Sequence, residues 1–101
     1  MSSSVKDAFV EVSPGAYRLE APLTFATVAA LHADGIRIID AASGEVTLDL
    51  QAVPKVDSAG LALLIEWLGE ARAKSRSLKY SQPPEALLSL ARLSDVEKLI
   101  A

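Results

Sequence analysis

Few side chains in this sequence could carry out chemistry. His32 is the only histidine and there is no cysteine, so a histidine pair, a cysteine nucleophile and a thiolate metal site are excluded. Asp40 and Asp49 could form a catalytic carboxylate pair, but no nucleophile, metal ligand set or glycine-rich phosphate loop accompanies them. We therefore predict that the protein is not an enzyme and binds no metal or cofactor. His32 is expected to be a packing residue.

The most informative hydroxyl is that of Ser58, in the run Asp57-Ser58-Ala59-Gly60. Ser58 stands where a helix N-cap is expected, and such a hydroxyl accepts a hydrogen bond from a backbone N–H of the first turn. A phosphate would also be tolerated there, because a helix N-terminus favours an anion, although Asp57 would oppose the added charge. Ser58 is predicted to be a cap, and it is also a candidate phosphoacceptor or interface residue.

Two neighbours of Ser58 each have alternative explanations. Asp57 either favours the helix dipole from just outside the first turn or accepts a hydrogen bond from a partner. Gly60 costs helix stability relative to alanine. A close approach of another backbone, from this domain or from a partner, would explain Gly60.

The helix that follows Ser58 is apolar on more than one face. One face must be core, and it comprises Leu61, Leu64, Ile65 and Leu68. Leu63 and Trp67 lie on a second face, near Glu66 and Glu70. They either pack against neighbouring helices or leave Trp67 partly exposed as an interface anchor, since aromatic residues are enriched at binding hot spots.

Hydrophobic periodicity predicts the elements that position these residues. Residues 9–12 and 17–20 predict a hairpin, because Pro14-Gly15 between them suits a type II turn. A helix is then expected from about Phe25 to Ser43-Gly44, weakened at Gly35. Its apolar face comprises Phe25, Val28, Ala29, His32, Ile36 and Ile39.

The second half of the chain alternates strands with helices. Val46, Leu48 and Leu50 alternate with polar residues and predict an interior strand, followed by a helix over 59–74 and a strand over 78–80. Pro84 at N1 and a capping box from Ser94 to Glu97 begin two further helices. These helices are expected to bury Leu87, Leu90, Ala91, Val96, Leu99 and Ile100. The predicted fold class is α/β, with the order ββαβαβαα and a mixed sheet.

Length and charge narrow the possible functions. The 101 residues suit a single domain over 1–101, with 1–7 expected to be a flexible N-terminal segment. The net charge of −3 argues against nucleic-acid binding, and the basic run over 72–79 is interpreted as a solvated helix end. We find no signal peptide and no apolar stretch long enough to span a membrane. The expected location is therefore the cytoplasm, with any role at a membrane carried by a partner.

The stretch from Val46 to Gly69 resembles STAS domains. Their pattern is a strand ending Asp-Leu, a loop valine, and then Asp-Ser/Thr-x-Gly-Leu opening a helix. The matching residues are Asp49, Leu50, Val53, Val56, Asp57, Ser58, Gly60 and Leu61. The tail from Pro84 to Ser94 also resembles the end of such domains. The resemblance therefore covers nearly the whole chain and implies a STAS-like fold.

This resemblance implies an interaction module, with two alternatives for its partner. The helix text GLALLIEWLGEAR looks most like the small cytoplasmic subunit of the Mla phospholipid ABC transporter, which binds the transporter's ATPase subunit. The alternative is an anti-sigma factor antagonist, in which the serine matching Ser58 is phosphorylated by a partner kinase. The partner interface expected by analogy comprises Val53, Lys55, Asp57, Ser58, Ala59, Gly60, Leu63 and Trp67.

Overall fold

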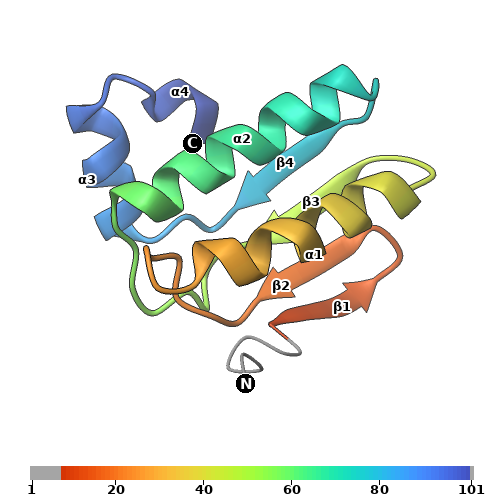
Figure 1. Ribbon diagram of the computed structural model, residues 1–101, viewed down its shortest axis with the longest axis horizontal. Coiled ribbons are helices and arrows are strands. Elements are labelled where there is room, and N and C mark those ends of the chain that lie inside the picture. Colours follow the sequence, from red (N-terminus) through yellow and green to blue (C-terminus); the bar gives the residue numbers. More distant parts are fainter. Residues whose placement is uncertain (1–7, 101) are drawn as a thin grey trace.

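Four short strands form the sheet that organises the chain. The computed structural model describes residues 8–100, and it confirms the predicted order ββαβαβαα (Figure 1). Strand β1 (Phe9–Ser13) runs antiparallel to β2 (Ala16–Leu19), and β3 (Val46–Asp49) and β4 (Leu78–Ser81) continue the sheet in parallel. The predicted α/β fold with a mixed sheet is confirmed. The segment 1–7, expected to be flexible, lies outside the described residues.

Helices cover one face of this sheet. Helices α1 (Val28–Ala41) and α2 (Ser58–Ala73) lie side by side across it, and α3 (Glu85–Leu93) and α4 (Glu97–Ile100) pack beside α2 (Figure 1). The sheet order follows the chain order, so each β–α–β unit adds one strand at the same edge. The loops that precede α1 and α2 are therefore neighbours at the C-terminal ends of β2 and β3.

Strand β3 is the interior strand that its sequence predicts. Val46, Leu48 and the following Leu50 are buried, while Thr47 and Asp49 point to the opposite face. On the neighbouring strand, the Tyr80 hydroxyl donates a hydrogen bond to the Leu64 carbonyl of α2 at 2.6 Å. Burial raises the pKa of the Tyr80 phenol, so it remains a neutral donor that ties α2 to the sheet.

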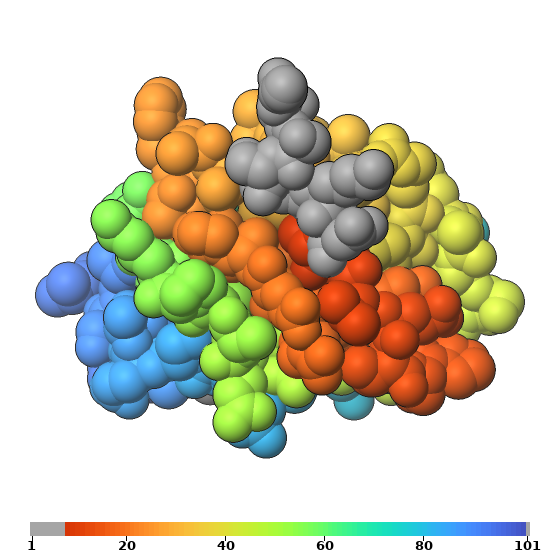
Figure 2. Space-filling view, turned by 90° about the horizontal axis from the view of Figure 1, so that it is seen from below, coloured from red at the N-terminus to blue at the C-terminus, as the bar shows by residue number. Residues whose placement is uncertain are grey.

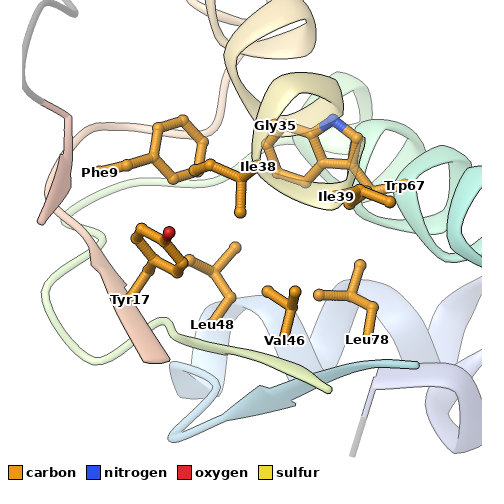
Figure 3. Close-up of a pocket in the computed structure, with 9 residues that line it drawn as sticks. All are labelled: Phe9, Tyr17, Gly35, Ile38, Ile39, Val46, Leu48, Trp67 and Leu78. Carbon is orange, nitrogen blue, oxygen red and sulfur yellow. The ribbon is translucent and has the colours of Figure 1, made fainter. Parts of the chain in front are cut away.

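Trp67 fills the space between α1, α2 and the sheet. Its indole lies against Gly35 of α1 (Figure 3), and its Nε1 donates a hydrogen bond to the His32 carbonyl at 3.3 Å. A Cβ at Gly35 would lie only 2.2 Å from the Trp67 ring, so glycine is required there for the helices to approach. Trp67 is 1% exposed, and the expectation that it is a partly exposed anchor is wrong. The helix also runs through Gly35 without a break.

The buried face of α1 matches the predicted one only in part, since Ile39 is buried as predicted and Val28 and Ile36 pack partly buried against the core. Leu31, Gly35 and Ile39, each four residues apart, form its centre. Phe25 precedes the helix, which has Thr27 as its N-cap, and the Phe25 side chain is 82% exposed. The predicted face omits Gly35 because glycine weakens a helix, yet its missing side chain lets α1 contact the Trp67 ring of α2 at this point.

The predicted helix starts near the C-terminus also require correction. Ser94 is the C-cap of α3, Asp95 has a positive φ of 59°, and α4 begins only at Glu97. The Glu97 carboxylate accepts from Arg92 at 3.0 Å instead of completing a capping box. Pro84 is the N-cap of α3 and not its first helical residue. Ile100 is buried as predicted, whereas Leu99 is 48% exposed.

Removing the Leu64 side chain tests this packing. Leu64 is fully buried between α2 and the sheet, so Leu64→Ala should lower the free energy of unfolding by about 2–5 kcal/mol. Leu93→Ala is the matched control because Leu93 is 87% exposed, and its loss should stay below about 0.5 kcal/mol. Urea denaturation measures both values. Similar losses for the two variants would contradict the packing.

Candidate functional site

Two loops are joined by backbone hydrogen bonds at the N-terminal end of α2. The Leu23 N–H donates to the Lys55 carbonyl at 2.8 Å, and the Asp57 N–H donates to the Leu23 carbonyl at 3.0 Å. These bonds form an isolated parallel bridge between Leu23 and Val56. Figure 2 shows the β3–α2 loop (green) against the segment before α1 (orange). The two loops therefore form one continuous surface.

The Asp57 carboxylate connects the same two loops a second time. Its Oδ1 accepts from the Gly60 N–H at 3.1 Å, and its Oδ2 accepts from the Phe25 N–H at 3.0 Å. The hydrogen bonds from Phe25 and Gly60, with the nearby Lys55 charge, hold the pKa of Asp57 below its ordinary value. Asp57 is thus the N-cap of α2, and the prediction that Ser58 is the cap is wrong by one residue.

Ser58 is consequently left available at the surface. It is the first residue of α2 and is exposed, and among residues 8–100 its hydroxyl makes no hydrogen bond. A phosphate or a partner's anion at this position would meet the positive end of the helix dipole, although the Asp57 carboxylate next to it would oppose the charge. The geometry leaves Ser58 able to act as an interface residue or as a phosphoacceptor.

The domain's own backbone explains Gly60. A Cβ on Gly60 would lie 2.0 Å from the Leu23 carbonyl oxygen, closer than any side chain could approach. Of the two explanations left open by the sequence, the close approach of this domain's own backbone is therefore confirmed. Any larger residue would push apart the two loops that Asp57 holds together.

The expected interface residues divide into two groups. Lys55 and Ser58 are exposed, and Asp57 and Ala59 are partly exposed, all on the surface at the start of α2. The remaining members are buried in this chain, and they are Val53, Gly60, Leu63 and Trp67. Their burial removes them from direct contact with a partner, because Val53, Leu63 and Trp67 belong to the hydrophobic core and Gly60 packs against the Leu23 carbonyl.

Phe25 is the residue of this surface that the sequence reasoning missed. Its side chain is 82% exposed, while its backbone is fixed by the hydrogen bond to Asp57. Next to it, a shallow groove between α1 and α2 is lined by Val28, Ala29, His32, Ala59, Ala62, Leu63 and Glu66. Thr27 could have revealed this, because a threonine before the first apolar helical residue is an N-cap signal that excludes Phe25 from the helix.

Nothing at this surface resembles a catalytic centre. His32 Nε2 lies 3.2 Å from Glu66 Oε2 at the surface, which is an ion pair only when His32 is protonated. Asp40 pairs with Lys74, and Asp49 Oδ1 accepts from the Gln51 N–H at 2.8 Å. Within the described part of the chain no three acidic, histidine or cysteine side chains are grouped to hold a metal.

A two-layer domain of this order with an exposed serine opening α2 has the architecture of a STAS domain. The family model described as the MlaB STAS domain matches residues 11–101, and the chain belongs to this family. No curated protein sequence gives a match to this chain.

Solved structures share the fold at low sequence identity. An anti-sigma factor antagonist from Thermotoga maritima, so described, has a TM-score of 0.74 at 13% identity, covering 91% of this chain and 80% of its own. Unphosphorylated SpoIIAA, also an anti-sigma factor antagonist, has a TM-score of 0.71 at 17% identity, covering 92% and 84%. A sulfate transporter family protein from Wolinella succinogenes has a TM-score of 0.68 at 17% identity, covering 91% and 75%.

The role of Asp57 predicts how stability changes with pH. Because its pKa is lower when folded than the ordinary 3.8, the carboxylate stabilises the fold above about pH 3.8. This contribution should be lost as pH falls through the folded pKa. Asp57→Asn keeps a capping side chain without the charge. The stability difference between wild type and Asp57→Asn should therefore be largest at neutral pH and shrink in acid.

Urea denaturation at a series of pH values measures this difference. Ser58→Ala is the control, since the Ser58 hydroxyl does not cap the helix and its removal should leave stability unchanged at every pH. A difference between wild type and Asp57→Asn that stays constant from about pH 7 to about pH 2.5 would contradict the assigned role of Asp57.

Proposed function

We propose that this chain is the accessory subunit that docks on the ATPase of an ABC-type phospholipid transporter of the Mla kind and supports its assembly or activity. The match of the MlaB STAS family model over residues 11–101 is the observation that carries this proposal. STAS domains are typically non-enzymatic interaction modules, and this supports a docking role. The chain would act by occupying a surface of the ATPase.

The surface at the start of α2 has the properties of a protein docking site. Phe25 offers an exposed aromatic side chain on a backbone that is already fixed, so little conformational freedom is lost on binding. The exposed Ser58 and the small side chains of Ala59 and Ala62 lie beside it and allow a partner's helix or loop to come close. We propose Phe25 as the anchor of the interface and Ser58 as a polar contact near it.

The proposed location is the cytoplasmic face of the membrane, reached through the transporter. Among residues 8–100, no helix is both long and apolar enough to cross a bilayer. In this proposal, attachment to the membrane depends on binding to the ATPase.

A second function is favoured by the state of Ser58. An exposed hydroxyl on the first residue of a helix is accessible to a kinase, and anti-sigma factor antagonists share this fold. The alternative is therefore an anti-sigma factor antagonist whose binding is switched by phosphorylation of Ser58. A doubly charged phosphate beside Asp57 would repel an acidic partner surface, and burying it against an apolar one would carry a desolvation cost.

Two substitutions test the docking surface. Phe25→Ser should weaken binding to the purified ATPase by at least about 2 kcal/mol, or roughly 30-fold, because it removes the aromatic anchor. Ser58→Asp should also abolish or strongly weaken binding, since it places a second carboxylate beside Asp57 in the contact. Both variants should melt like wild type, because both side chains are exposed. Titration calorimetry and thermal melts measure these effects.

The control for Phe25→Ser is Leu93→Ser, which removes an equally exposed apolar side chain from α3. It should leave ATPase binding unchanged. If wild type does not bind the ATPase but gains phosphate from a serine kinase, and Ser58→Ala blocks that gain, the anti-sigma alternative replaces the transporter proposal. Normal ATPase binding by Phe25→Ser and Ser58→Asp would mean that the interface lies elsewhere.

A further inference from the structure

A second groove lies on the opposite flank of α2, and it is lined by the C-terminal half of α2 and by Lys98 and Leu99 of α4. Figure 1 shows α4 beside α2. It has a cavity volume of about 460 Å³, continued along α2 by a smaller hollow of about 180 Å³. Leu68, Arg72 and Leu99 line both parts, so the two hollows form one groove. No residue of the surface around Phe25 and Ser58 contributes to it.

The rim of this groove carries two positive charges, those of Arg72 and Lys98. Among residues 8–100, Arg72 and Lys98 form no ion pair, whereas most other lysines and arginines in that range do. Both side chains are exposed and both line the groove. Arg76 also lines it, but its guanidinium donates to the carbonyls of Ala42 and Asp40. Two exposed cations that form no ion pair within residues 8–100 therefore lie at one site, in a chain whose net charge is −3.

The smaller hollow of the groove is mainly apolar, whereas the larger one carries the charged and hydroxyl side chains. Ile65 and Leu68 of α2 are only partly buried, although the sequence predicts them as core residues. Leu99 is 48% exposed on the facing side. Apolar side chains between two cations suit a ligand that carries both apolar and acidic groups.

We propose that this groove binds an acidic amphipathic segment of a partner protein, with apolar side chains over Ile65, Leu68 and Leu99 and carboxylates at Arg72 and Lys98. A groove between two helices accommodates a peptide chain, and its two exposed cations complement an acidic one. The proposal is independent of the docking surface at the start of α2. It gives the domain a second binding site on the other flank of the same helix.

Gly69 offers a way to block the groove without damaging the fold. It lies in the smaller hollow, and a Cβ placed on it would meet nothing within 4 Å. Gly69→Gln would therefore extend a side chain into the groove. Because glycine is unfavourable inside a helix, the substitution should not lower stability. Gly44→Gln is the matched control, since Gly44 also has open space around it but lies in the α1–β3 loop.

The experiment is a selection of random peptides displayed on phage against the full-length protein, with the Arg72→Gln/Lys98→Gln double variant used for counter-selection. The enriched peptides should combine Asp or Glu with Leu, Ile or Phe. In titrations with one such synthetic peptide, each single neutralisation should weaken binding about twofold to fivefold. Gly69→Gln should abolish binding, and Gly44→Gln and Phe25→Ser should bind like wild type.

Three results would overturn the proposal. One is a selection that enriches only peptides whose binding does not depend on Arg72, Lys98 and Gly69. Another is enrichment of basic or uncharged peptides. The third is co-sedimentation with phosphatidylglycerol vesicles that Gly69→Gln or the double neutralisation abolishes, since this would assign the groove to a membrane surface. Because Phe25→Ser is included, a failure here is distinguishable from a failure of the ATPase docking surface.

Discussion

The Asp57 carboxylate is the interaction on which the candidate site depends. One oxygen closes the first turn of α2 at Gly60, and the other holds the backbone of Phe25, which lies 32 residues away in the chain. The charge that caps the helix is thus the same charge that fixes the loop before α1. Backbone hydrogen bonds at Leu23 already join the two loops, and the Asp57 side chain reinforces this join by satisfying a donor in each of them.

Two glycines make this arrangement sterically possible. Gly60 lets the start of α2 touch the Leu23 carbonyl, and Gly35 lets α1 settle onto the Trp67 ring. Both contacts bring backbone closer to its neighbour than any side chain would allow. Contacts with the loop before α1 therefore fix the N-terminal end of α2. The Trp67 ring fixes the middle of α2 against α1.

The sequence predicts the framework better than it predicts the surfaces. The alternation of Val46, Leu48 and Leu50 has a period of two, and this identified β3 and its buried face correctly. At the start of α2, Asp57 and Ser58 are both good caps, and only the geometry shows which one bonds to Gly60. The apolar residues of α2 extend around most of the helix, so periodicity could not decide between Trp67 and Ile65 as the exposed side. The family resemblance pointed to the start of α2 but not to Phe25, which we propose as the anchor.

The apolar side chains of α2 that remain partly exposed are not the ones that the sequence suggests. The sequence shows more apolar surface on this helix than one buried face needs, and Trp67 was the natural candidate for the excess. Trp67 is buried in the core because Gly35 leaves room for its ring. The partly exposed apolar side chains of α2 are instead those of Ile65 and Leu68, which lie beside Arg72, a residue with no ion pair within 8–100. Helix α2 packs on α1 along one side, and its other side keeps a partly exposed apolar stripe, formed by Ile65 and Leu68, next to the positive charge of Arg72. The polar cap at one end of α2 and the apolar stripe along its other flank place both of the proposed binding surfaces on this helix.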